Sequence, residues 1–227
     1  MTHDGRRHAI LAIDTATTRV VIATGSSDGV ADGISTWAAG HRHGETLLPS
    51  IERFLGEQNL RRSRLAGVVV GTGPGAFTGL RVGIATAKGL AHGLRIPLVG
   101  VSTADALIAA ATTADGARIV LLVPAGPSDR IVIRHGEPPR LLPGGTDPEL
   151  APGERLVAID LADRAPEAAL AAGELARAGL GAALLAAGAA ALRSGRSELE
   201  TLVPEYVTLP RGARAGDGTV AWSRDPR

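Results

Sequence analysis

The chain has 227 residues, of which 44% are hydrophobic and 21% charged, and its formal net charge is +1. This balance excludes wholesale disorder, and it lacks the basic excess of a protein that binds nucleic acid by itself. The absence of cysteine excludes disulfides, thiolate catalysis and cysteine-ligated metal. Arg, Gly, Pro or Asp interrupts each apolar stretch before the roughly 18 residues of a membrane span. We therefore expect a soluble, cytoplasmic protein with no membrane contact.

Apolar runs in the first hundred residues predict a series of strands. They cover residues 8–14, 19–24, 30–37, 66–71 and 97–101. Helical periodicity predicts helices over residues 45–55, 80–94 and 103–111. Pro49 must lie in the first turn of the first helix or kink it. The succession predicts a mixed sheet with helices on its faces, in a first lobe that covers residues 1–104.

A smaller second lobe is expected over residues 105–227. Its predicted strands cover residues 118–123, 130–134 and 155–159, and a last extended run covers 206–209. Two alanine-rich segments, residues 166–178 and 181–193, have strong helix propensity despite their glycines. We interpret them as two packed helices, the C-terminal one packing back on the first lobe. The polar residues that follow are expected to form a mobile tail.

The string IDTATT, residues 13–18, lies at the turn between the first two predicted strands. An acidic residue followed by small and hydroxyl residues can hold metal-bound phosphate there, because short side chains let backbone N–H groups reach the oxygens. The second lobe has no matching acidic turn, since residues 123–129 read VPAGPSD. A complete ATP clamp is therefore not expected. Two readings remain, a plain hairpin turn or a residual nucleotide contact, which would involve Asp14, Thr15, Thr17, Gly73 and Gly75.

The most specific string in the chain is GTGPGAFTGLR, residues 71–81. It lacks the lysine of a P-loop and the spacing of the dinucleotide fingerprint. Gly73, Pro74 and Gly75 suit a tight turn, and Thr78 is expected to cap the helix that follows.

Small residues recur every fourth position in that helix, at Gly79, Gly83, Ala87 and Ala91. A second, polar stripe consists of Arg81, Ala85, Lys88 and His92. The smooth stripe would let another backbone pack closely. That backbone belongs either to the chain's own sheet or to a helix of another subunit, and the sequence leaves both readings open.

Two clusters of charged or ligating residues remain. His41, His43 and Glu45 could ligate metal, but the two histidines lie two residues apart, so capping or interface polarity is favoured over a metal site. The arginines at 61, 62 and 64 could contact phosphate, although a short charged run between helix and strand is usually a solvated turn. The sequence contains neither a GxSxG elbow nor an HExxH motif, so no catalytic residue is assigned.

Residues 10–106 resemble the TsaB family, also called YeaZ and often labelled M22 glycoprotease-like. The likeness rests on IDTATT, on HGETLLP at residues 43–49, and above all on GTGPGAFTGLRVGIATAKGLA at residues 71–91. Family members carry a near-identical GPGSFTGLR, in which Ala76 here replaces the usual serine. LVPEYVTLPRGA, residues 202–213, looks like the family's closing Pro-x-Tyr segment.

The resemblance implies an α/β, two-lobe fold of the actin, heat-shock-70 and sugar-kinase type, which is ribonuclease H-like. It implies a non-catalytic scaffold subunit for the tRNA N6-threonylcarbamoyladenosine modification at adenosine 37. The chain would bind the catalytic subunit TsaD, with the ATPase TsaE assisting transiently. Alone it would form a homodimer and need no cofactor. ATP or ADP would bind at the junction with TsaD, and tRNA would be contacted only through the complex.

By the same resemblance, the partner surface lies on the two helices that follow the meander. Together with the smooth stripe it comprises His43, Glu45, Thr46, Leu47, Leu48, Phe77, Arg81, Gly83, Ala85, Ala87 and Lys88. The family's second lobe usually opens with Asp-Ala-Arg, which VPAGPSDR lacks, so the likeness over residues 115–165 is faint. Two enzyme readings compete, an ATP-dependent small-molecule kinase and an M22-type metalloprotease, but each needs groups that the sequence does not supply.

Overall fold

The computed structural model describes residues 8–38 and 43–206. Its first sheet has the strand order β3-β2-β1-β4-β5. These strands are β1 (Ala9–Asp14), β2 (Arg19–Ser26), β3 (Ala31–Ala38), β4 (Leu65–Gly71) and β5 (Leu98–Val101). The first three form an antiparallel meander, and β4 and β5 continue the sheet parallel to β1.

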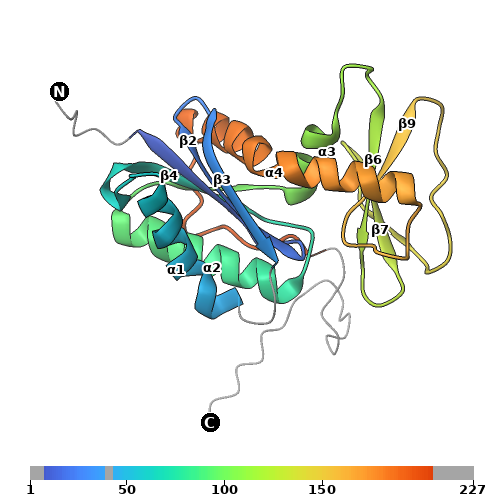
Figure 1. The fold of residues 1–227 in the computed structure, drawn as a ribbon, viewed down its shortest axis with the longest axis horizontal. Helices are drawn as coiled ribbons and strands as arrows, with labels where there is room; N and C mark the ends of the chain where they lie inside the picture. Colours follow the sequence, from blue (N-terminus) through green and yellow to red (C-terminus); the bar gives the residue numbers. More distant parts are fainter. Residues whose placement is uncertain (1–7, 39–42, 207–227) are drawn as a thin grey trace, which may run out of the picture.

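Helices cover both faces of this sheet, which is why β1 is buried along its whole length. Helices α1 (His43–Glu57) and α2 (Phe77–Leu94) lie on one face, and α4 (Glu167–Arg193) crosses the other (Figure 1). Alternate residues of β1 point to opposite faces of the sheet and belong to two different hydrophobic cores. Leu11 and Ile13 pack on the α1–α2 side, and Ile10 and Ala12 on the α4 side.

The second sheet has the order β8-β7-β6-β9 and carries fewer strands. Its strands are β6 (Arg118–Pro124), β7 (Arg130–Arg134), β8 (Arg140–Leu142) and β9 (Glu154–Ala158). Helix α3 (Thr103–Ala111) leads from the first sheet to the second and packs along α4. The two mixed sheets flanked by helices confirm the predicted α/β class. Strand β8 was not predicted, because a three-residue strand carries no periodicity.

The alanine-rich segments form one continuous helix, so the prediction of two helices was wrong. Helix α4 is 27 residues long and contacts both sheets. Its glycines are points of close approach: a Cβ on Gly188 would lie 2.2 Å from Cγ2 of Val69, and one on Gly173 would lie 1.9 Å from the carbonyl oxygen of Ala158. The glycines therefore serve packing against the two sheets and do not interrupt the helix.

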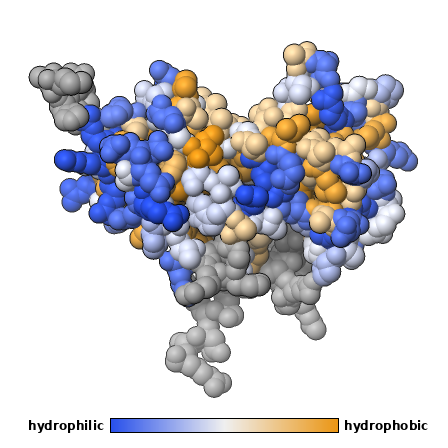
Figure 2. Space-filling view, in the orientation of Figure 1, coloured by the Kyte–Doolittle hydropathy of each residue, from blue (hydrophilic) through white to orange (hydrophobic). Residues whose placement is uncertain are grey.

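Helix α4 also corrects the expectation that no segment is long and apolar enough to span a membrane. Within the described part of the chain it alone meets that length and composition. Its packing on the sheets explains why buried positions such as Leu180 and Leu184 are apolar. The outer side is apolar as well, since Leu175 is 76% exposed. Figure 2 shows this hydrophobic surface in the upper middle and right of the view, where α4 crosses the molecule.

The first two helices begin earlier than predicted. Helix α1 starts at His43, so Pro49 lies inside the helix and not in its first turn. Helix α2 starts at Phe77, because the carbonyl oxygen of Ala76 already accepts from the amide of Leu80. Thr78 therefore lies within the helix and is not its cap.

Candidate functional site

The hairpin turn between β1 and β2 holds its acidic residue away from solvent. Asp14 has no exposed surface, accepts a 2.6 Å hydrogen bond from the hydroxyl of Thr103, and accepts a 2.9 Å bond from the amide of Ala16. A Cβ on Gly71 would lie 1.8 Å from its Oδ2. Burial raises the pKa of Asp14 to about 6, against the opposing effect of these hydrogen bonds. Asp14 therefore cannot reach a ligand between the lobes.

Thr15 is sealed in the same way, beneath α2. Its side chain is fully buried, and its hydroxyl donates a 2.8 Å bond to the carbonyl oxygen of Gly79. A Cβ on Gly79 or Gly83 would lie 2.1 Å and 2.2 Å, respectively, from oxygens of Thr15. The stripe of Gly79, Gly83, Ala87 and Ala91, named the inner stripe below, thus packs on the chain's own sheet. This settles the alternative that the sequence left open.

A cleft of about 520 Å³ lies between the turn of β1 and β2 and the second lobe. Of the residues predicted to contact nucleotide, Thr17 and Gly75 line it. Gly73 instead turns toward α3, where its amide donates a 3.1 Å bond to the hydroxyl of Thr103. The structure thus brings only part of the predicted nucleotide set to the cleft, because Asp14 and Thr15 lie beneath it.

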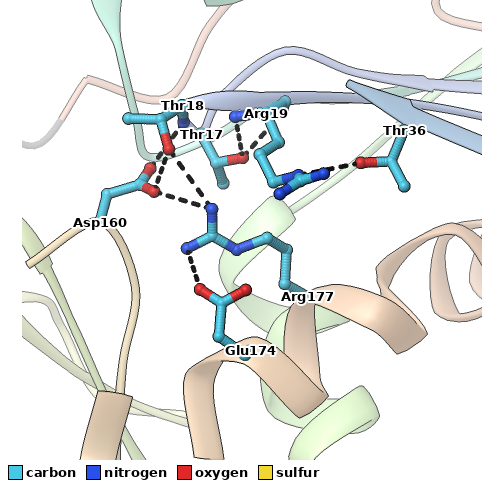
Figure 3. A network of polar contacts seen from close by, with 7 residues as sticks. All are labelled: Thr17, Thr18, Arg19, Thr36, Asp160, Glu174 and Arg177. Atoms are coloured by element: carbon cyan, nitrogen blue, oxygen red, sulfur yellow. Dashed lines mark hydrogen bonds and ion pairs between the residues drawn. The ribbon is translucent and has the colours of Figure 1, made fainter. Parts of the chain in front are cut away.

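A polar network that the sequence did not predict joins the two lobes across this cleft (Figure 3). The amide of Thr18 donates a 2.7 Å bond to Oδ2 of Asp160, and its hydroxyl donates to Oδ1. Arg177 of α4 lies 3.1 Å from Oδ1 of Asp160 and 3.2 Å from Oε1 of Glu174. The side chains of Asp160 and Arg177 are 7% and 10% exposed, so this ion pair is nearly buried, whereas Thr18 and Glu174 are exposed.

This network changes what the cleft can bind. A backbone N–H in such a turn could donate to a phosphate oxygen, but in this chain the carboxylate of Asp160 already occupies the N–H of Thr18. The sequence signal was faint, since Asp160 follows a strand but lies 142 positions from Thr18 and has a left-handed backbone with φ of 58°. The amide of Thr18 is therefore not free in this structure to donate to a phosphate oxygen.

The predicted partner surface divides into buried and exposed residues. Leu47, Gly83 and Ala87 lie within the chain's own core, so their assignment to a partner surface was wrong. Glu45, Thr46, Leu48, Arg81 and Ala85 are exposed. The side chain of His43 and the whole of His41 lie outside the described residues, and with them the metal site considered at His41, His43 and Glu45. The described residues contain no cluster of three metal-ligating side chains.

Residues near the C-terminal end of the described chain lie along α2. Tyr206 stacks on Phe77 with a ring-centroid distance of 5.1 Å, and its hydroxyl lies 3.2 Å from Nε of Arg81. Nζ of Lys88 donates a 3.4 Å bond to the carbonyl oxygen of Glu200. Phe77, Arg81 and Lys88 are therefore partly engaged by the chain itself.

Helix α2 exposes a second run of small residues that the sequence reading missed. Ala85, Gly89 and Gly93 recur every fourth position on its solvent side and are named the outer stripe below. Apart from its own helix, a Cβ on Gly89 or Gly93 would meet no atom of the described residues within 4 Å. With the exposed residues Glu45, Thr46 and Leu48 of α1 and Arg81 of α2, the outer stripe forms what we call the α1–α2 face.

Comparison with known proteins places the chain in a family. Residues 19–201 match the family model TsaD, tRNA N6-adenosine threonylcarbamoyltransferase. The tRNA threonylcarbamoyladenosine biosynthesis protein TsaB of Escherichia coli is 36% identical over 112 residues, which are 49% of this chain and 48% of that protein. The tRNA N6-adenosine threonylcarbamoyltransferase of Geotalea daltonii is 42% identical over 78 residues, 34% of this chain and 23% of the enzyme. The chain thus spans about half or less of these curated relatives.

A solved structure agrees over a longer stretch. YeaZ from Pseudomonas aeruginosa superposes with a TM-score of 0.66 at 25% identity, covering 88% of this chain and 100% of the other. The chain therefore belongs to the family of TsaD, the tRNA N6-adenosine threonylcarbamoyltransferase, and within it resembles the TsaB or YeaZ proteins.

Proposed function

We propose that this chain is a scaffold subunit of tRNA N6-threonylcarbamoyladenosine modification, which docks the catalytic subunit TsaD on its α1–α2 face and has no catalysis of its own. The observation that carries the proposal is the outer stripe. A glycine inside a helix costs about 1 kcal/mol relative to alanine, and no close approach within the described residues requires a glycine at position 89 or 93. Close approach of another helix would account for both.

The family relationship says what kind of helix would approach. The enzyme of Geotalea daltonii shares sequence with this chain over 78 residues, so it contains a region related to this one. Two related lobes can pair the same surfaces about an approximate twofold axis. A TsaD partner would then present its own helices to α1 and α2, and the same pairing would form a homodimer when TsaD is absent.

The geometry between the lobes supports the non-catalytic part of the proposal. Asp14 lies below the cleft surface, and the amide of Thr18 is bonded to Asp160. A kinase would need these groups to face its nucleotide. We propose instead that ATP or ADP binds at the junction with TsaD. TsaE is proposed as a transient partner, with tRNA contacted through the assembled complex in the cytoplasm.

The docking proposal is tested by the variant Gly89→Leu with cognate TsaD. Its Cβ would meet no atom of the described residues within 4 Å outside the helix itself, so we expect a normal circular dichroism spectrum. We expect the complex, measured by isothermal titration calorimetry, to weaken by about 30-fold or more, equivalent to about 2 kcal/mol.

The matched control is Ala171→Leu, at an exposed small residue of α4. It adds a large apolar side chain away from the α1–α2 face and should leave the affinity unchanged. Equal affinities for Gly89→Leu and the wild type would refute docking on this face. Failure of the wild-type chain to associate with TsaD at micromolar concentrations would refute the scaffold role itself.

Two cheap measurements test the rival enzyme readings. Stoichiometric ATP binding with turnover by the isolated chain would favour the small-molecule kinase. Bound zinc together with peptide cleavage would favour the M22-type metalloprotease. The scaffold proposal expects neither, and it expects ATP turnover to require the assembled complex.

A further inference from the structure

Helix α4 presents an apolar side to solvent. The helix is long and apolar enough to span a membrane, yet only 39% of its most apolar 18-residue window is buried. A helix at the surface of a globular protein normally carries polar residues on its outer side. In α4, which the structure describes throughout, Glu174 is the one exposed charge between the two end residues. The other exposed positions between the ends are Ala168, Ala171, Leu175, Ala178, Ala186, Ala187 and Ala190.

Two exposed side chains at the edge of the first sheet extend this apolar side. Val30 is 65% exposed and Ile34 is 42% exposed. A Cβ on Gly181 would lie 3.2 Å from Cγ2 of Ile34, and one on Gly29 would lie 2.8 Å from Cα of Ala186, so both segments lie against α4. We call the exposed apolar residues of α4 together with Val30 and Ile34 the α4 face (Figure 2). A contiguous apolar patch of this kind marks an interaction site.

The charges at the two ends of α4 indicate what covers this face. The helix begins at Glu167 and ends at Arg193, and both residues are exposed. Arg193 donates a 2.7 Å bond to the carbonyl oxygen of Ser27, which leaves its charge without an acidic partner among the described residues. If two copies of α4 pack antiparallel about a twofold axis, each Glu167 lies beside the Arg193 of the other copy. A parallel pair would bring like charges together, and an anionic lipid surface would repel Glu167 and Glu174.

The sizes of the side chains fit the same antiparallel arrangement. With the twofold axis at the middle of the helix, Leu175 of one copy lies opposite Ala186 of the other, so a large side chain meets a small one. Glu174 lies opposite Ala187, so no like charges meet. Near the axis the exposed residue is Ala178, and short side chains there let two helices approach closely. The α4 face is therefore complementary to itself.

We propose that the α4 face is a homotypic interface, on which a second copy of this chain packs its own α4 antiparallel about a twofold axis. Helix α4 covers the opposite face of the first sheet from α1 and α2 (Figure 1). The pairing thus uses a surface different from the one proposed for TsaD and leaves the α1–α2 face open. It goes beyond the proposed function and does not depend on it.

The test is a charge reversal, read out as the dimer dissociation constant of the full chain by sedimentation equilibrium. All variants carry Gly89→Leu, so that pairing through the α1–α2 face does not contribute. Glu167→Arg and Arg193→Glu should each weaken the dimer about tenfold, because by symmetry like charges then meet twice. The double variant restores both opposite-charge pairs and should return the dissociation constant to within about threefold of the parent value. A merely structural role of the two residues would make the double variant the weakest.

A second variant tests the apolar part of the face. Leu175→Lys should weaken the dimer about tenfold or more, because a leucine side chain that would be buried in the pair is lost. The matched control is Leu141→Lys, at another exposed leucine. It lies in β8, at the opposite edge of the second sheet from β9, the strand on which α4 packs. This control should leave the dissociation constant unchanged.

A wild-type chain that stays monomeric up to the millimolar range would overturn the proposal, and so would a double variant that fails to recover. Binding to phosphatidylcholine–phosphatidylglycerol vesicles that Leu175→Lys abolishes would identify a lipid surface as the occupant and overturn it as well. A weaker TsaD complex in Leu175→Lys would assign the α4 face to TsaD, against the proposal. Normal docking of TsaD by a chain that remains monomeric would leave the scaffold role standing.

Discussion

The two sides of α2 carry the same kind of residue at the same spacing, but they have different surroundings. The inner stripe of Gly79, Gly83, Ala87 and Ala91 is buried on the chain's own sheet, with Gly79 and Gly83 against Thr15. The outer stripe of Ala85, Gly89 and Gly93 faces solvent. The inner glycines are explained by contacts of this chain, and the outer ones are not. A small-residue pattern therefore acquires a meaning only when its neighbours are known.

The largest effect is expected at the inner stripe, for Gly79→Ala. The new Cβ would lie 2.1 Å from the backbone carbonyl oxygen of Thr15, and a backbone atom cannot turn aside as a flexible side chain can. We expect the free energy of unfolding to fall by about 3 kcal/mol or more, as for an overpacked core. Urea denaturation followed by circular dichroism measures the change. If the variant were as stable as the wild type, α2 would not be packed closely against the turn.

The pH dependence of stability tests whether Asp14, in the turn between β1 and β2, is closed off from water. Burial raises the pKa of Asp14 from 3.8 to about 6, so the folded state holds this proton more tightly than the unfolded chain does. Stability from this group is therefore present at low pH and is lost as pH rises from 3.8 through about 6. The full difference is about 3 kcal/mol, at 1.36 kcal/mol per pKa unit.

The variant Asp14→Asn isolates this contribution, since it cannot ionise. Its free energy of unfolding relative to the wild type should rise between pH 4 and pH 7 and then remain constant, which urea titrations at several pH values would show. Parallel profiles for the two proteins would mean that Asp14 reaches water.

The sequence predicted most of the first lobe, because β1, β2 and β4 are buried on both faces and are largely apolar. It failed at α4, where two helices were predicted with a gap at residues 179–180 and the structure has one. Gly179 lies in that gap, and a Cβ on it would lie 3.0 Å from Cβ of Ala110 in α3, so the residue is a point of close packing. A glycine can interrupt a helix or let it pack closely against a neighbour. Which of the two it does depends on residues elsewhere in the chain, and local helix propensity carries no information about them.

The candidate site was less predictable, because its contacts are non-local. The bond between Thr18 and Asp160 joins residues 142 positions apart, and no periodicity indicates it. The orientation of α2 did have a signal. Leu80 and Ile84 are buried and follow Gly79 and Gly83 by one residue, so large apolar side chains mark the inner side as the core side. The polar stripe of Arg81, Ala85, Lys88 and His92 marked the other side of the helix, which carries Gly89 and Gly93.

The smallest effect is expected at the outer stripe, and its sign is opposite to that at the inner one. Gly89→Ala should raise the free energy of unfolding by about 1 kcal/mol, because alanine restricts the unfolded chain and its methyl group meets no atom within 4 Å in the fold. The same methyl group should weaken the TsaD complex severalfold by keeping the partner's helix farther away. Thermal denaturation and calorimetry of the one variant measure both. A gain in stability without a loss of affinity would mean that no helix packs on Gly89, and the outer stripe would then be only an unoptimised surface.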